Sequence, residues 1–160
     1  MTGTETLFVG PQLELVANRN LSVAVWRDVP TVEVMREVSR AGRTLSKRYP
    51  TGTGHMNLFV GGTPRFTEEV RAETVKIARD STLFTLGVAR VFLVGGFVGV
   101  AVRTFLNTAT LVAGPSLRPL QAFTNVEDAA AWLAPKLEVG ETHWKPADIV
   151  ALAAPLAKSV

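Results

Sequence analysis

The part of the sequence that most limits its fold is an apolar stretch, Val88–Ala113, with a glycine pair, Gly95–Gly96, in its middle. Before the glycines, Val88–Val94 is the most continuous strand signal in the chain and predicts a central strand covered on both faces. After them, apolar residues recur every three or four positions and predict a helix over about Phe97–Ala113. The longest apolar stretch, Val91–Val102, is shorter than the roughly 20 residues that cross a bilayer, so we expect no transmembrane segment.

Upstream of this stretch, the sequence predicts a hairpin, a helix and a strand. Two β-rich runs, Leu13–Ala17 and Leu21–Trp26, are separated by the turn sequence Asn18–Asn20 and predict the hairpin. A helix over about Thr31–Arg48 follows, and its first residue is a good N-cap. The apolar run Met56–Val60 comes after a glycine-rich loop and predicts a short buried strand.

The other predicted elements complete an alternation of strands and helices. They are a short apolar start at Leu7–Val9, a helix that ends near Asp80 and is capped by Thr63 or Thr67, a last strand over Leu117–Phe123, a short helix capped by Asn125, and a final helix that opens at Lys145–Pro146. Strands that alternate with helices are typical of a largely parallel sheet.

We therefore predict a single α/β domain with a mixed, largely parallel sheet of about five strands, an antiparallel N-terminal hairpin and about four flanking helices. The length of 160 residues is common for one domain. Residues 1–137 are expected to form this domain. Residues 138–160 are expected to form a C-terminal extension, helical and packed on the domain or on a partner.

The polar residues do not form a pattern that indicates catalysis. The chain has no cysteine, which excludes disulfides, thiolate metal sites and cysteine nucleophiles. Its two histidines, His55 and His143, have no second ligand at metal-binding spacing, and no serine stands in a nucleophile-elbow sequence. We therefore expect a protein that is not an enzyme, has no catalytic residue and binds no metal or cofactor.

The N-terminus and the charge bear on compartment and partners. Met1–Gly10 lacks the basic start and the long apolar run of an export signal, and the lack of cysteine fits a reducing compartment, so we expect a cytoplasmic protein. The formal net charge of +3 favours acidic partners. It falls short of a nucleic-acid-binding composition, so nucleic acid is not an expected partner.

Basic residues at spacings of four, three and four predict a charged stripe, the basic ridge, made of Arg36, Arg40, Arg43 and Lys47. At about 100° per residue, the ridge lies opposite the Leu45 side of the helix. One interpretation is a solvated outer face that is partly paired with Glu33 and Glu37. The other is a docking surface for an acidic protein or, as a peripheral contact, for anionic lipid. Nucleic acid fits least because no aromatic residues interleave with the charges.

The helix after the glycine pair has more apolar surface than one core contact needs. Its polar side is interrupted by three residues, the apolar contact surface, made of Phe97, Val100 and Leu111. Another part of the chain, a second copy in a homodimer, or a different protein or lipid could each cover it.

Three segments carry a family resemblance: Val23–Arg27 leading into Thr31, Arg90–Val94 before the apolar helix, and Phe123–Leu133, which contains an Ala-x-x-Trp-Leu-like helix. With the order of elements, they resemble the STAS-type domain of anti-sigma-factor antagonists, in particular its SpoIIAA-like branch in bacterial proteins. The resemblance covers about Leu13–Leu137. It implies a protein-binding module that is not an enzyme.

The resemblance also implies a candidate switch. Anti-sigma-factor antagonists are phosphorylated in the loop before their second helix, and the similar loop here is Gly61–Pro64, where Thr63 is the hydroxyl residue. The Asp-Ser pair that marks the phosphoacceptor in the family is absent from this loop. An N-cap before a first-turn proline explains Thr63 more simply.

The sequence thus predicts a regulatory or scaffold protein that docks to another protein in a bacterial cytoplasmic system. The alternative is a carrier or sensor of a small apolar or lipid ligand, held beneath the helix at Val98–Phe105.

Overall fold

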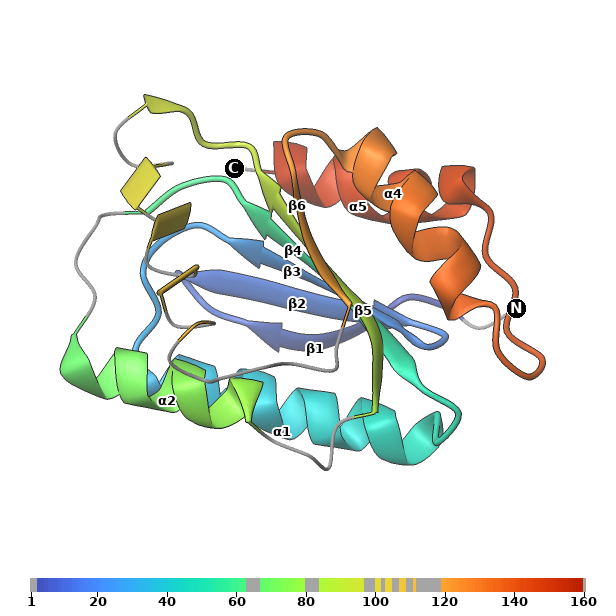
Figure 1. The fold of residues 1–160 in the computed structure, drawn as a ribbon, viewed down its shortest axis with the longest axis horizontal. Helices are drawn as coiled ribbons and strands as arrows, with labels where there is room; N and C mark the ends of the chain where they lie inside the picture. The colour runs from blue at the N-terminus through green and yellow to red at the C-terminus, as the bar shows by residue number, and fades with distance from the viewer. Residues whose placement is uncertain are drawn as a thin grey trace.

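The computed structural model describes residues 3–62, 67–79, 84–96, 100, 101, 103, 104, 107, 108, 111 and 119–159. In this part of the chain a six-stranded sheet lies between two layers of helices (Figure 1). In chain order and in sheet order, the strands are β1 (Glu5–Val9), β2 (Leu13–Asn18), β3 (Leu21–Trp26), β4 (Thr53–Phe59), β5 (Thr85–Phe92) and β6 (Leu120–Phe123). The first three strands are antiparallel and the last four are parallel, which confirms the predicted α/β class and N-terminal hairpin.

The sheet has one strand more than the predicted five. The sequence indicated only a short apolar start at Leu7–Val9, but β1 begins at Glu5 and pairs with β2 from there. Glu5 is a poor strand former in isolation, and here it pairs in register with Ala17 of β2. This long-range contact explains why the sequence pattern missed the strand.

The strand β4 begins at Thr53, inside the glycine-rich stretch that the sequence predicted as a loop. One glycine of that stretch, and a second glycine on β5, have a packing role within the sheet. Gly54 and Gly87 are directly paired on β4 and β5 and face the same helix layer. A Cβ atom at Gly54 would lie 2.3 Å from Leu137 Cδ2, and one at Gly87 would lie 3.1 Å from Leu133 Cδ1. The glycines are therefore strand residues that let this helix layer pack closely on the sheet.

The strand β5 begins before the predicted Val88 and is not covered equally on its two faces. Gly87, Ala89 and Val91 are buried, whereas Val88 and Arg90, which point to the other face, are half-buried. The prediction that β5 is fully covered on both faces is therefore wrong for the face that carries Val88 and Arg90. The last strand, β6, is also shorter than predicted and begins at Leu120.

One face of the sheet is covered by α1 (Val32–Arg48) and α2 (Glu68–Ala78) (Figure 1). As predicted, the Thr31 hydroxyl caps α1 and accepts a hydrogen bond from the Val34 amide. Of the two residues predicted to cap α2, Thr67 does so, and its hydroxyl accepts from the Val70 amide at 3.2 Å. Each hydroxyl satisfies a free backbone N–H at the helix start.

The core on the α1/α2 face is built around three stacked aromatic rings. Trp26, Phe59 and Phe92 come from the carboxyl ends of β3, β4 and β5. The ring centroids are 6.4 Å apart for Trp26 and Phe59, and 5.1 Å apart for Phe59 and Phe92. Met35 from α1 and Val70 from α2 belong to the same buried cluster, so both helices are fixed to the sheet by apolar packing.

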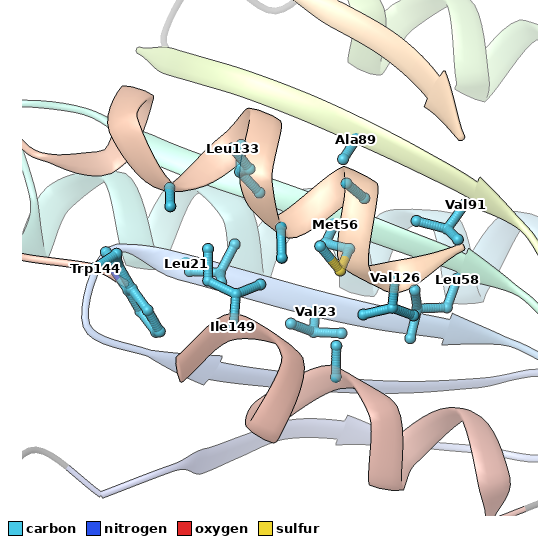
Figure 2. Close-up of a cluster of buried hydrophobic side chains, with 14 of the residues drawn as sticks. Leu21, Val23, Met56, Leu58, Ala89, Val91, Val126, Leu133, Trp144 and Ile149 are labelled. Carbon is cyan, nitrogen blue, oxygen red and sulfur yellow. The ribbon is translucent and has the colours of Figure 1, made fainter. Parts of the chain in front are cut away.

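The other face is covered by α4 (Val126–Leu133), the 3-10 turn η1 (Ala134–Leu137) and α5 (Pro146–Lys158). Asn125 caps α4 as predicted, and its Oδ1 accepts from the Asp128 amide at 2.7 Å. Figure 2 shows the cluster between these helices and the sheet, in which Leu133 and Ile149 lie over Leu21 and Met56. This is the larger of the two buried apolar clusters.

The start of the C-terminal segment is tied to the β2–β3 turn through Asn20, which is only 1% exposed. Its Oδ1 accepts from Trp144 Nε1 at 2.9 Å, and its Nδ2 donates to the carbonyls of Gly52 and Leu137, both at 3.2 Å. The Arg19 guanidinium lies 3.7 Å from the centre of the Trp144 ring. One turn therefore holds three distant parts of the chain.

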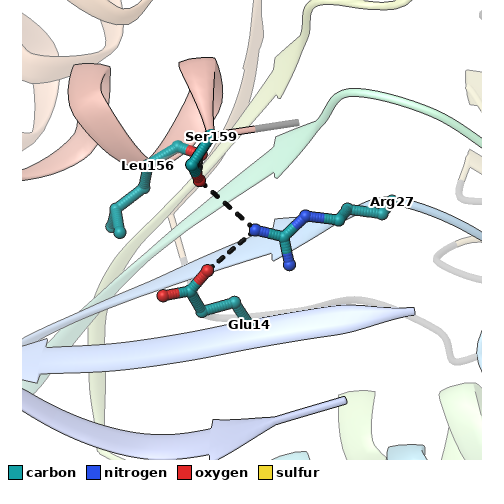
Figure 3. A network of polar contacts seen from close by, with 4 residues as sticks. All are labelled: Glu14, Arg27, Leu156 and Ser159. Atoms are coloured by element: carbon teal, nitrogen blue, oxygen red, sulfur yellow. Dashed lines mark hydrogen bonds and ion pairs between the residues drawn. The ribbon is translucent and has the colours of Figure 1, made fainter. Parts of the chain in front are cut away.

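The end of α5 is tied to the opposite end of the same hairpin (Figure 3). Arg27 Nη2 on the β3 side donates to Glu14 Oε2 of β2 at 2.7 Å and to the Ser159 hydroxyl at 3.4 Å. The Ser159 hydroxyl in turn donates to the Leu156 carbonyl at 2.8 Å. Residues 138–159 are thus held to the sheet at both ends.

The connection between β5 and β6 is helical at its described positions between 96 and 111. Arg103 lies over the ring of Phe92, with the guanidinium carbon 4.9 Å from the ring centre. Phe92 faces the α1/α2 layer, so this contact places Arg103 on that face.

Within the described part of the chain, no helix is both long enough and apolar enough to cross a membrane.

Replacement of Asn20 by alanine is expected to lower the free energy of unfolding by about 3 kcal/mol, because the Trp144 indole and two buried carbonyls lose their partner. The control in the same hairpin is Asn18→Ala, which loses an exposed bond to Thr4 and a part-buried bond from Arg19 Nε and should cost about 1 kcal/mol. Urea denaturation followed by tryptophan fluorescence measures both losses. Equal losses in the two variants would contradict the role of Asn20.

Candidate functional site

The basic ridge lies on the outer side of α1. Arg36, Arg40, Arg43 and Lys47 are all exposed, while Val34, Met35 and Leu45 on the inner side are buried. The spacing of the four residues therefore places their charges on a single face of a helix that the core holds in position.

Two ridge residues are oriented by neighbours on the same helix. Arg40 Nη1 lies 2.7 Å from Glu37 Oε1, which agrees with the expected partial pairing by Glu37. Arg43 Nη1 donates to the hydroxyl of buried Ser39 at 2.7 Å. The Arg40–Glu37 pair is exposed and contributes little to stability. The ridge can therefore engage an acidic group at low cost.

The apolar contact surface is described in part. Val100 is 65% exposed and Leu111 is 80% exposed, so both side chains are available to a partner. Phe97, the third residue of this surface, lies outside the described residues. Thr63, the candidate switch, also lies outside the described residues.

The structure brings together a row of polar residues that the sequence did not predict as a site. Ser22 of β3, His55 and Asn57 of β4, and Arg90 of β5 all point to the α1/α2 face. His55 is paired in register with Ser22, and Asn57 with Arg90. We call these four residues the polar row. The row crosses three neighbouring parallel strands, β3, β4 and β5, on the face that α1 and α2 cover.

Hydroxyl groups lie against both ring nitrogens of His55 in this row. The Ser22 Oγ is 2.7 Å from Nδ1 and the Thr53 Oγ1 is 3.3 Å from Nε2. Ser22 is only 7% exposed, so its hydroxyl is not open to a substrate from solvent. The two hydroxyl groups fix the orientation of the His55 ring. The arrangement differs from a catalytic triad, in which a carboxylate orients the histidine.

The other end of the row combines an amide with a guanidinium. Asn57 Oδ1 accepts from Trp26 Nε1 at 3.0 Å, which joins the polar row to the stacked aromatic rings. Burial lowers the pKa of Arg90 to about 10, because removing the guanidinium from water disfavours its charged form. The row is thus a partly desolvated polar layer inside an otherwise apolar contact.

In the sequence, the polar row is indicated only by the alternation of polar and apolar residues along a strand. His55 and Asn57 are two residues apart, as are Val88 and Arg90, so each pair lies on one face of its strand. The apolar runs around them predicted buried strands and concealed this alternation. The pairing of β4 with β5, which brings Asn57 beside Arg90, is not visible in either segment alone.

A shallow hollow of about 150 Å³ lies at the C-terminal end of α1, beside β1 and β2. Its charged lining residues are Glu5, Arg19 and Arg48. Arg48 is paired with Glu5 and holds the pKa of that carboxyl below its ordinary value, while Arg19 bonds the His143 carbonyl. These charges are already used within the fold, so the hollow offers little to a ligand. The described residues also contain no group of three or more side chains suited to a metal ion.

The lowered pKa of Arg90 predicts a pH effect with a definite sign. Between about pH 10 and the ordinary arginine range, the folded protein binds fewer protons at this group than the unfolded chain. Unfolding therefore takes up a proton in this window, and this group makes stability rise with pH there. NMR titration of the arginine ¹³Cζ signals, in the folded protein and in urea, measures the shift. A folded-state titration at the urea value would contradict it.

No protein-family model matches this chain, and neither a curated protein nor a solved structure matches it significantly. The α/β architecture therefore stands on the structure itself. The resemblance to the STAS-type domain remains a prediction from the sequence segments that carry it.

Proposed function

We propose that this protein is a docking module of a bacterial cytoplasmic system, similar to the STAS-type domain and without enzymatic activity, which binds an acidic protein through the basic ridge. The observation that carries the proposal is that the excess positive charge of the chain is concentrated on α1. The helix α1 contains five basic and two acidic residues. This excess equals the formal net charge of +3 of the whole chain, so the rest of the chain is balanced.

The chemistry of the ridge suits carboxylates. Three of its four residues are arginines, whose planar guanidinium groups bind carboxylates through two parallel hydrogen bonds. Their exposed side chains can be reached by a partner, although Arg40 and Arg43 already bond Glu37 and Ser39 within the helix. The buried inner side of α1 keeps the helix in place before binding. A rigid helix loses little conformational freedom on binding, which favours affinity.

Charge reversal of the ridge tests this proposal. Affinity capture with the wild-type protein first identifies an acidic partner, and calorimetry then measures its binding to purified variants. The double variant Arg40→Glu/Arg43→Glu is expected to weaken binding at least about tenfold and to reduce its salt dependence. The matched control is Arg71→Glu/Lys76→Glu on α2, which makes the same charge change at two exposed positions.

Three outcomes would contradict the proposal. One is equal binding by the ridge variant and the wild type, with the same thermal unfolding. Another is equal weakening by the α2 control, which would indicate only overall charge. The third is an apolar small molecule that co-purifies in native mass spectrometry, with no captured protein, which would favour the carrier or sensor alternative.

A further inference from the structure

The two edges of the sheet differ in how they are protected. The edge strands are β1 and β6, and in the described part of the chain β6 pairs only with β5. Leu120, Gln121 and Ala122 of β6 are exposed. An exposed edge strand offers free backbone N–H and C=O groups to another chain.

The register identifies which backbone groups of β6 point outward. The Val88 amide donates to the Pro119 carbonyl at 2.8 Å, and Val88 is paired with Leu120. In a parallel pair, alternate residues direct both backbone groups to the neighbouring strand, so Gln121 and Phe123 face β5. The N–H and C=O groups of Leu120 and Ala122 therefore point away from the sheet.

The edge at β1 carries a bulge and a charge, which discourage strand addition, whereas β6 has only its short length of four residues as protection. The pairing of β1 with β2 is interrupted by a register shift between Thr6 and Phe8, and β1 begins with the charged Glu5. Bulges and charges are the usual protection of an edge strand. The sequence of β6, Leu-Gln-Ala-Phe, contains no charge and no proline, and its register with β5 is regular.

We infer that β6 pairs antiparallel with β6 of a second copy of this chain, which extends the sheet across a two-fold axis at Gln121. In this register Leu120 lies opposite Ala122 of the partner subunit, and each such pair exchanges two backbone hydrogen bonds. All the outward backbone groups of Leu120 and Ala122 are then satisfied. The self-complementary register is the reason to assign a second copy of the same chain as the partner.

The exposed residues of the β5–β6 connection extend this interface. Leu120 and Ala122 point to the same face as Val88, which is the face where Arg103 contacts Phe92. The two-fold axis therefore brings the two connections together on one side of the extended sheet. Val100 and Leu111, both exposed on the connection, supply apolar area beyond a four-residue strand pair. Stable interfaces need this additional area.

This interface goes beyond the proposed docking function and does not block it. The helix α1 packs against β1, at the opposite edge of the sheet from β6. A dimer formed at β6 therefore leaves the basic ridge of each copy exposed, so each dimer presents two ridges.

The variant Ala122→Pro tests the strand pairing because it removes only an outward N–H group. Proline is tolerated at such a position of an edge strand, and Gln121 before it is already extended. Sedimentation equilibrium should find the wild-type protein at twice its mass of 17.2 kDa. Ala122→Pro should weaken dimerisation at least about tenfold, since two symmetry-related hydrogen bonds are lost. The control Ala122→Thr keeps the N–H group and should remain dimeric.

A second variant keeps the test decisive if the proline variant does not fold. Leu120→Lys places like charges on both sides of the axis and is expected to dissociate the dimer while circular dichroism stays unchanged. A wild-type protein that is monomeric at millimolar concentration would overturn the inference. A folded Ala122→Pro protein as dimeric as the wild type would also overturn it. A dimer that survives both β6 variants but is lost in Leu111→Arg would assign association to the connection and overturn the strand pairing.

Discussion

The β2–β3 hairpin holds the C-terminal helix at both of its ends, and the rest of the fold depends on this attachment. Asn20 in the hairpin turn binds Trp144 at the start of the segment, and Arg27 at the open end binds Ser159 at its finish. Between these contacts, Ile149 and Ala153 of α5 fill the core over β3. Without α5, the fully buried side chains of β3 would face water. Residues 138–159 are therefore an integral layer of the domain.

Helix layers pack on both faces of the sheet, although β5 is only half-buried on the α1/α2 face at Val88 and Arg90. On the α4/α5 face, the glycines of β4 and β5 allow helix and sheet to pack closely. On the α1/α2 face, the stacked rings and the polar row occupy the contact. Among the described residues, the exterior carries the basic ridge near one edge of the sheet and the uncharged strand β6 at the other. In the proposed dimer, this separation leaves the basic ridge of each copy accessible to the proposed partner.

The sequence predicted what depends on neighbouring residues and missed what depends on distant ones. The caps Thr31 and Asn125 and the opening of α5 at Pro146 follow local rules and are found as predicted. The basic ridge is likewise a matter of helical spacing. The strand β1, by contrast, depends on its pairing with β2, and the polar row exists only once β3, β4 and β5 are placed side by side.

The most direct test of the docking account is an NMR map of the ¹⁵N-labelled protein as its captured partner is added. The account predicts shifts that cluster on the outer side of α1, around Arg36, Arg40 and Arg43. Shifts centred on His55 and Arg90, with α1 unchanged on its outer side, would contradict it and place the ligand beneath the helices.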